Sequence, residues 1–174
     1  MIADDEPKIR QGLKSVLEEM QLPITVCAEA RNGMEALEKA EQSQPDFILM
    51  DICMPKLSGI EFLEELRKLD QNCPVIVISG FNEFSYAKQA IKLGVSEYLL
   101  KPIAEEELKA AVVKVIEEIK QKRKSEKFME LVKQQMVQNQ DYLRDVFFNE
   151  WKVNYPDPNG KNRQDFLTWI FRII

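Results

Sequence analysis

The stretch that decides the fold reads Phe47-Ile-Leu-Met-Asp51-Ile-Cys-Met-Pro-Lys-Leu-Ser-Gly59-Ile60. It begins with a short apolar run that ends at Asp51. Pro55 and the pair Ser58-Gly59 follow, and an amphipathic segment begins after them. A short, continuous apolar run fits a strand buried on both faces, as in a parallel sheet. The Ser-Gly pair is typical of the start of a helix. This stretch therefore predicts a buried strand followed by a helix.

The same alternation recurs through the first 120 residues. Predicted strands cover residues 2–3, 24–30, 47–50, 75–78 and 98–100. Predicted helices cover residues 7–19, 33–41, 60–69, 83–93 and 104–119. Five strand–helix repeats predict an α/β fold, a doubly wound five-stranded parallel sheet. The first strand is shorter than the usual ~5 residues, so we expect residues to be missing upstream of it.

Composition excludes several classes of protein. Of the 174 residues, 45% are apolar and 30% are charged, as in globular proteins. No apolar run approaches the ~18 residues of a membrane span, and no secretion signal opens the chain, so we expect a cytoplasmic protein with no membrane partner. We interpret Cys27, Cys53 and Cys73 as reduced thiols. Histidine is absent, so any chemistry must use carboxylates, lysines and hydroxyls.

The charge distribution predicts two units. Residues 1–120 hold 14 Lys and Arg against 22 Asp and Glu, whereas residues 121–174 hold 10 against 7. We expect a domain over 1–120 and a helical segment over 121–174, with the preceding helix running through the basic residues 120–127. Those basic residues suit a solvated helix face better than a nucleic-acid footprint.

An apolar stripe follows in the second unit, at helical spacing. Its members are Phe128, Leu131, Val132, Met136, Leu143, Val146 and Phe147. We interpret the stripe as a homodimer seam, with packing inside the chain as the alternative. A break is predicted over residues 155–160, followed by an apolar face that reaches the last residue, so we expect the natural chain to continue.

Five polar side chains stand at the predicted carboxyl ends of strands, where open α/β sheets bind ligands. They are Asp4, Asp5, Asp51, Ser79 and Lys101. Three converging carboxylates repel one another unless a cation lies among them. Mg²⁺ prefers oxygen ligands and commonly binds one or two carboxylates together with phosphate oxygens. A hydroxyl and an ammonium group would complete a phosphate site.

These residues lie in five motifs that occur in order along the chain. The motifs are Ala3-Asp4-Asp5-Glu6, Met50-Asp51-Ile52-Cys53-Met54-Pro55, Leu57-Ser58-Gly59, Ile78-Ser79-Gly80 and Tyr98-Leu99-Leu100-Lys101-Pro102. Together they resemble the receiver domain of two-component response regulators, over residues 1 to about 120. The resemblance implies the flavodoxin-like (CheY-like) receiver fold with a C-terminal helical extension.

The resemblance also implies roles in a phosphorylation site. Asp51 would accept the phosphoryl group from a sensor histidine kinase. Asp5 would bind Mg²⁺ directly, Asp4 mainly through water, and Asp51 and the backbone carbonyl of Cys53 would be further ligands. Lys101 would pair with a phosphoryl oxygen, and the Lys101–Pro102 bond would be cis.

A conformational switch follows from the same resemblance. Ser79 would move toward the phosphoryl group, and Tyr98 would turn inward when the hydroxyl moves, although plain packing also explains an aromatic residue there. We expect the segment 80–93, with its aromatic residues Phe81, Phe84 and Tyr86, to be the moving face.

The segments around 79–94 and 125–151 resemble a subgroup of receivers that carry a helical linker and an AraC-type helix-turn-helix domain. DNA would then be bound only through that domain, which this sequence lacks. A stand-alone receiver acting by protein–protein contact or phosphorelay is the alternative. An aspartyl-phosphate phosphatase would place a second carboxylate two residues after Asp51, where Cys53 stands, so we do not expect an enzyme.

Overall fold

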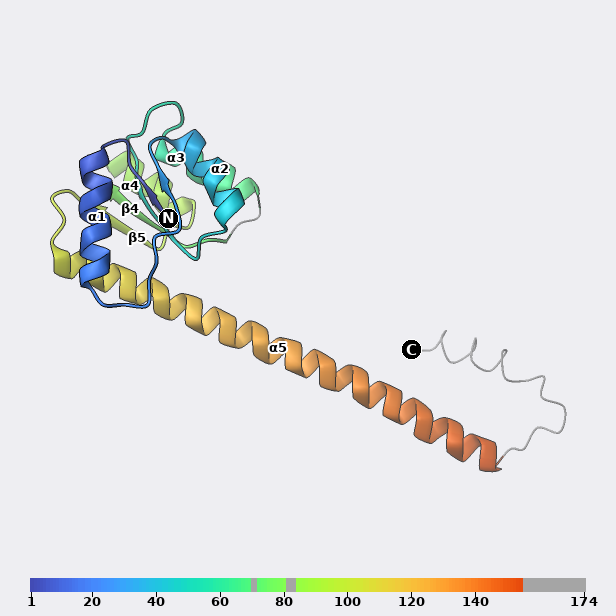
Figure 1. Cartoon of the computed structure of the whole chain (residues 1–174). Coiled ribbons are helices and arrows are strands. Elements are labelled where there is room, and N and C mark those ends of the chain that lie inside the picture. The colour runs from blue at the N-terminus through green and yellow to red at the C-terminus, as the bar shows by residue number, and fades with distance from the viewer. Residues whose placement is uncertain (70–71, 81–83, 155–174) are drawn as a thin grey trace. The chain divides into compact units, whose positions relative to one another are not determined.

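The computed structural model describes residues 1–69, 72–80 and 84–154, and it contains an α/β sheet of five parallel strands (Figure 1). The strands are β1 (Ile2–Ala3), β2 (Glu29–Ala30), β3 (Ile48–Asp51), β4 (Val75–Ser79) and β5 (Glu97–Leu100). The helices are α1 (Pro7–Glu19), α2 (Gly33–Ser43), α3 (Gly59–Lys68), α4 (Phe84–Lys92) and α5 (Glu105–Asn154). The strand order is β2-β1-β3-β4-β5, which confirms the predicted fold.

Helices cover both faces of the sheet, and each face has its own hydrophobic core. On one face, α1 and the first turns of α5 supply Leu13, Leu17, Leu108, Val112 and Val115. On the other face, helices α2, α3 and α4 pack against alternate strand residues. The central strands β3 and β4 are fully buried, which explains why their sequences are continuous apolar runs.

The prediction of a strand over residues 24–30 was wrong, because only Glu29–Ala30 forms one. β2 is an edge strand, and its neighbour β1 offers only Ile2 and Ala3 for pairing. In residues 24–27 the side chains alternate between half-buried and exposed, so this segment is not buried on both faces. The predicted helix over 104–119, in contrast, continues through the basic residues to Asn154, as expected from the absence of Pro and Gly.

The chain divides into two units, Met1–Lys122 and Arg123–Ile174. The roles assigned above to residues 1–120 and 121–174 stay predictions. Three sequence predictions lie outside the described residues, namely the break over 155–160, the apolar face after it and the role of Phe81.

Among the residues that the structure describes, no helix combines the length and apolarity needed to cross a membrane. Cys27, Cys53 and Cys73 are not joined in disulfide bonds.

Arg67 ties the C-terminal end of α4 to α3. Its guanidinium donates hydrogen bonds to the carbonyl oxygens of Leu93 (2.9 Å), Gly94 (3.1 Å) and Cys73 (3.1 Å). Backbone carbonyls at a helix C-terminus lack partners within the helix, and a cation there also meets the negative end of the helix dipole. The C-terminal end of α4 is therefore anchored, while its other end follows the loop after β4.

Gly59, the first residue of α3, permits a close approach between this helix and the end of β3. A Cβ atom there would lie 2.5 Å from Met50 Cε, 2.6 Å from the Asp51 carbonyl oxygen and 2.7 Å from Ile52 Cα. The Gly59 amide donates to the Ile52 carbonyl oxygen at 2.8 Å, and Ser58 and Glu61 form a reciprocal cap. The start of α3 thus packs directly on the backbone at Asp51.

We predict that Gly59→Ala lowers the free energy of unfolding by about 1–3 kcal/mol, because two of the three crowded atoms belong to the backbone and cannot move aside. Gly12→Ala in α1 is the matched control, since nothing lies within 4 Å of a Cβ there. It should raise stability by about 0.5–1 kcal/mol, because alanine favours a helix more than glycine does. Urea unfolding of both variants checks this, and equal stabilities would contradict it.

Candidate functional site

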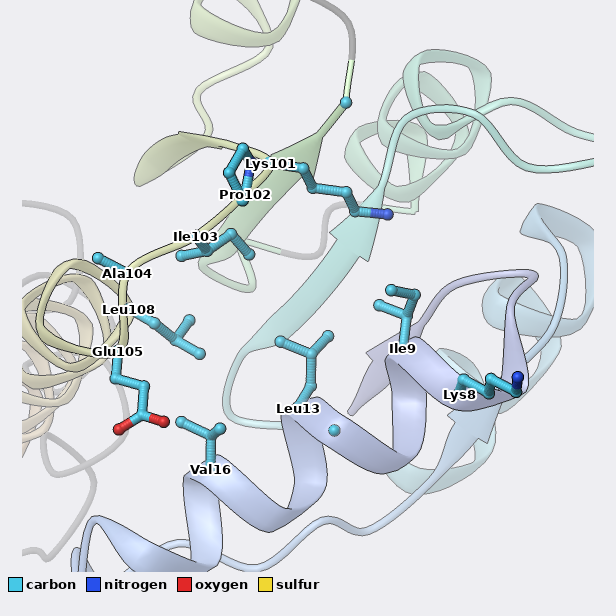
Figure 2. A pocket seen from close by; sticks show the side chains of 12 residues that line it. Lys8, Ile9, Leu13, Val16, Lys101, Pro102, Ile103, Ala104, Glu105 and Leu108 are labelled. Atoms are coloured by element: carbon cyan, nitrogen blue, oxygen red, sulfur yellow. The ribbon is translucent and has the colours of Figure 1, made fainter.

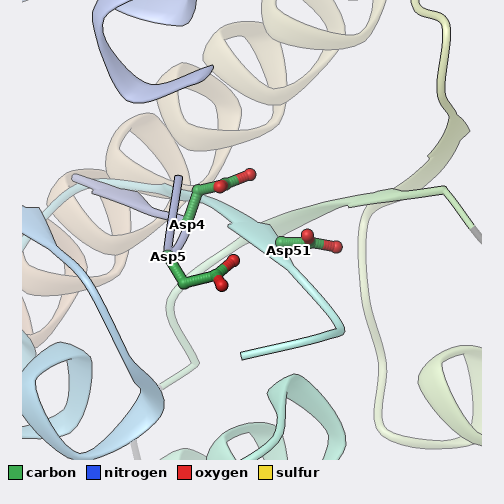
Figure 3. A group of neighbouring side chains, drawn as sticks. All are labelled: Asp4, Asp5 and Asp51. Carbon is green, nitrogen blue, oxygen red and sulfur yellow. The ribbon is translucent and has the colours of Figure 1, made fainter. Parts of the chain in front are cut away.

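Three carboxylates gather at the carboxyl edge of the sheet (Figure 3). Asp4 and Asp5 follow β1, and Asp51 is the last residue of the neighbouring strand β3. The parallel register pairs Ala3 with Met50, so the residues after each of them emerge side by side. One oxygen from each of the three carboxylates lies within 4.8 Å of the others. The two strands therefore build an acidic pocket from residues 47 positions apart in sequence.

The three carboxylates differ in burial. Asp4 is 1% exposed and Asp51 is 7% exposed, whereas Asp5 stands in solvent at the mouth of the pocket. Asp4 Oδ1 accepts a hydrogen bond from the Glu6 amide at 2.9 Å. Asp51 Oδ1 has a longer contact, 3.4 Å, with the Cys53 amide. The pocket thus contains two buried carboxylates, Asp4 and Asp51, and one accessible carboxylate, Asp5.

Lys101 compensates part of the negative charge. Its Nζ lies 3.0 Å from Asp4 Oδ2 and 3.0 Å from Asp51 Oδ2. Burial alone would lower the pKa of Lys101, but the hydrogen bonds to Asp4 and Asp51 outweigh it and raise the pKa above its ordinary value. The ammonium group therefore stays charged and holds one oxygen of each buried carboxylate.

The donor set of the pocket suits a hard divalent cation. Three carboxylates and one ammonium group leave two net negative charges at this point. All the side-chain donors are oxygens, which Mg²⁺ prefers over nitrogen and sulfur. Because Asp5 is exposed, an ion can reach the pocket from solvent.

Of the other predicted site residues, Ser79 and Cys53 lie at the same edge, whereas Tyr98 lies two residues before the end of β5. Ser79 is the last residue of β4 and is fully buried, and its carbonyl oxygen accepts from the Lys101 amide at 2.8 Å. Tyr98 in β5 is half-buried and packs against the core beneath α2, α3 and α4. Cys53 is exposed beside Asp51. The bond between Lys101 and Pro102 is cis, as the resemblance implied.

Sequence reasoning missed Arg10. Its Nη1 donates to the Asp4 carbonyl oxygen at 2.7 Å, and its Nε lies 3.4 Å from Glu29 Oε2. Arg10 thereby holds the backbone at Asp4 from the first turn of α1. One arginine in an amphipathic helix carries no sequence signal for this role.

A hollow of about 580 Å³ lies beside the pocket, lined mostly by apolar groups of α1 and of the segment after β5 (Figure 2). Leu13, Val16, Ile103 and Leu108 form its wall, and Lys101 lines it too. The lysine thus belongs both to this hollow and to the acidic pocket.

Comparisons with known proteins agree with this geometry. A model of the response regulator receiver domain matches residues 1–113. The chain is 38% identical over 120 residues to the transcriptional regulatory protein YesN of Bacillus subtilis, covering 69% of this chain and 33% of that protein. It is 34% identical over 116 residues to the transcriptional regulatory protein HptR of Staphylococcus aureus, covering 67% and 45%. The chain thus spans less than half the length of these curated relatives.

Solved structures show the same fold. The receiver domain of AraT, a response regulator from Geobacillus stearothermophilus, is 41% identical with a TM-score of 0.64, covering 70% of this chain and 95% of that one. A chain of the CheX–CheY–BeF3–Mg complex structure from Borrelia burgdorferi is also similar. That match is 26% identical with a TM-score of 0.62 and covers 66% of this chain and 86% of that one.

We predict that Lys101→Met, measured in EDTA, lowers the free energy of unfolding by about 1–3 kcal/mol at pH 8, because Asp4 and Asp51 lose their shared partner. The folded-state pKa of Lys101 is raised above 10.5, so its contribution is complete below pH 10.5 and is lost as the pH rises through that folded-state value.

The stability difference between wild type and Lys101→Met should therefore shrink in strongly alkaline buffer. Lys109→Met, at an exposed position of α5, is the matched control and should match wild type at pH 8. A Lys101→Met variant as stable as this control would show that the ammonium group does not compensate the pocket.

Proposed function

The chain belongs to the response regulator receiver domain family, and on that premise we propose that it is a phosphorylation-activated switch in which Asp51 accepts the phosphoryl group. One observation carries the proposal, namely the convergence of Asp51 with Asp4, Asp5 and Lys101 at one edge of the sheet. Phosphoryl transfer to a carboxylate depends mainly on positioning and on charge neutralisation. This pocket can supply both.

We assign the acidic pocket to Mg²⁺. Asp5, Asp51 and the backbone carbonyl of Cys53 would be direct ligands, and Asp4 would act mainly through water. The bound ion would supply positive charge next to the phosphoryl oxygens. The fit rests on the all-oxygen donor set and on the two uncompensated negative charges.

In the transfer step a carboxylate oxygen of Asp51 forms a bond to phosphorus, while the bond from phosphorus to the donor breaks and its electron pair leaves with the donor. Lys101 holds Asp51 Oδ2 at 3.0 Å and so orients the carboxylate, whereas Oδ1 has only the long contact from the Cys53 amide among the contacts described above. The donor would be a phosphohistidine of a sensor histidine kinase. The hollow beside Lys101 gives such a donor protein an apolar surface next to the pocket.

Phosphorylation would then change the balance of charge. The acyl phosphate adds about −1.5 to −2 charges at Asp51, which draws Lys101 and the hydroxyl of Ser79 toward it. Movement of Ser79 would make room for Tyr98 to turn inward and would bias the segment between β4 and α4. Because Arg67 anchors the C-terminal end of α4, we expect the displacement to be greatest at its N-terminal end.

The output we propose is control of transcription in the cytoplasm, through a helix-turn-helix domain of the AraC type in a longer chain. The support is that the relatives named above are transcriptional regulatory proteins and exceed this chain in length. A stand-alone receiver acting by contact or phosphorelay is the second candidate. We do not propose an enzyme with a separate substrate, because Cys53 stands where an aspartyl phosphatase needs a carboxylate.

We predict that acetyl phosphate with Mg²⁺ adds the mass of one phosphoryl group to the wild-type chain, and that Asp51→Asn abolishes this addition, because an amide oxygen is a much poorer nucleophile. Intact-protein mass spectrometry measures the product. Asp46→Asn, an exposed position just before β3, is the matched control and should be labelled like wild type. Equal labelling of Asp51→Asn would refute the assignment.

A further inference from the structure

Arg10 contacts the backbone of both aspartates that follow β1. Its Nη1 donates to the Asp4 carbonyl oxygen at 2.7 Å and approaches the Asp5 carbonyl oxygen at 3.4 Å. The backbone amide of Arg10 donates to the Glu6 carbonyl oxygen at 3.2 Å, so the residue is also part of the first turn of α1. One residue therefore ties the turn of residues 4–6 to the helix that follows it.

The carboxylates of the two aspartates are held differently. Asp4 Oδ1 accepts a hydrogen bond from the Glu6 amide, and Asp4 Oδ2 lies 3.0 Å from Lys101 Nζ. The Asp5 carboxylate lies close to those of Asp4 and Asp51 (Figure 3), but no group of the described residues donates a hydrogen bond to it. The position of the Asp5 carboxylate therefore depends on the Asp5 backbone, which Arg10 contacts.

Glu29 at the start of β2 holds the guanidinium in this orientation. Arg10 Nε is buried without a hydrogen bond to any described residue, and it lies 3.4 Å from Glu29 Oε2. A guanidinium binds carboxylates strongly, so without Glu29 it could rotate toward the carboxylates of Asp4 and Asp5, where a cation has to bind. The ion pair with Glu29 thus keeps Arg10 directed at the backbone carbonyls.

Rigid placement of a ligand matters more for Mg²⁺ than for the larger Ca²⁺. Mg²⁺ demands nearly ideal octahedral geometry with oxygen ligands at about 2.0–2.1 Å, whereas Ca²⁺ accepts flexible geometries at about 2.3–2.6 Å. A carboxylate whose backbone is free to shift therefore loses affinity for Mg²⁺ before it loses affinity for Ca²⁺.

We propose that Arg10 is a positioning residue that makes the acidic pocket prefer Mg²⁺ over Ca²⁺. It does so by fixing the backbone of Asp4 and Asp5, and Glu29 acts through it. The inference rests on the proposed function, because it takes Asp5 as a direct ligand of the ion. It adds to that function a side chain that binds the backbone of the ligands and not the ion itself.

The charge of Arg10 acts in the opposite direction to its positioning role. A guanidinium near the pocket repels a divalent cation, so electrostatics alone predicts that removal of Arg10 tightens Mg²⁺ binding. Loss of positioning predicts weaker binding, because the groups that orient a ligand contribute to metal affinity. The sign of the change in affinity therefore separates the two effects.

Isothermal titration calorimetry of the whole chain, with MgCl2 and with CaCl2, tests the proposal. Arg10→Met should weaken Mg²⁺ binding by about tenfold, as removal of a group that orients a metal ligand does. The Ca²⁺ affinity should fall by less, so the preference for Mg²⁺ declines. Lys14→Met is the matched control, because Lys14 also lies near Glu29, at 3.8 Å, but makes no hydrogen bond to either aspartate within the described residues. It should bind both ions as wild type does.

Glu29→Gln shows whether Glu29 acts through Arg10. The Glu29 side chain is 39% exposed, so its replacement leaves the core intact. This change should weaken Mg²⁺ binding in the wild-type background but not in the Arg10→Met background, because residues that act as one unit are not additive. Additive losses in the double variant would exclude this role of Glu29.

Three results would each overturn the proposal, namely unchanged or tighter Mg²⁺ binding by Arg10→Met, an equal fall in its affinities for both ions, or the same loss in Lys14→Met. If urea unfolding in EDTA shows that Arg10→Met does not fold, the ratio of Mg²⁺ to Ca²⁺ affinity in Glu29→Gln decides instead. A wild-type chain that does not bind Mg²⁺ would contradict the metal site of the proposed function. Wild-type binding that the variants share contradicts only the role of Arg10.

Discussion

The repulsion between two buried carboxylates, Asp4 and Asp51, is the constraint on which the rest of this structure depends. Two like charges 4 Å apart cost about 4 kcal/mol at an effective dielectric constant near 20, and burial adds a desolvation cost. Lys101 offsets part of this by contacting both, but the exposed Asp5 adds a third negative charge. The pocket therefore favours any ligand that brings positive charge to this point. A cation bound here would reduce the repulsion between the carboxylates, and it could bind phosphate oxygens at the same time.

The fold holds the carboxylates together against that repulsion. Parallel pairing of β1 with β3 brings the ends of both strands to the same edge. The first residue of α3 then packs on the backbone at Asp51, at a distance that only glycine allows. Arg10 holds the backbone at Asp4 from the other side. These contacts involve the backbone, so the side chains of the pocket remain available for a ligand.

The sequence predicted most of the fold because the central strands are buried on both faces. The run from Phe47 to Met50 fitted a buried strand, and its end located Asp51 within one residue. The segment 24–27 misled the prediction, because apolar residues beside a sheet edge resemble a strand even where the short strand β1 offers them no partner in the register. The hydrophobic pattern of a sequence indicates which residues are buried, but it does not indicate which backbone groups form hydrogen bonds with a neighbouring strand.

The residues of the candidate site could be predicted from the sequence, but the contacts between their side chains could not. The residues at the carboxyl ends of parallel strands meet because of topology, so Asp4, Asp5, Asp51, Ser79 and Lys101 could be named in advance. Three contacts depend on three-dimensional geometry. Lys101 bridges Asp4 and Asp51, Arg10 contacts the Asp4 backbone, and the start of α3 is crowded at Gly59. No local pattern in the sequence encodes these distances.

The most direct test of the central claim is the melting temperature of the chain during a titration with MgCl2, at constant ionic strength set with NaCl. If a divalent ion relieves the repulsion in the pocket, the melting temperature of wild type rises and saturates, since a ligand that binds the folded state stabilises it. The Asp5→Asn variant should show a much smaller rise. A wild-type melting temperature that does not change with Mg²⁺, or an equal rise in Asp5→Asn, would contradict the account.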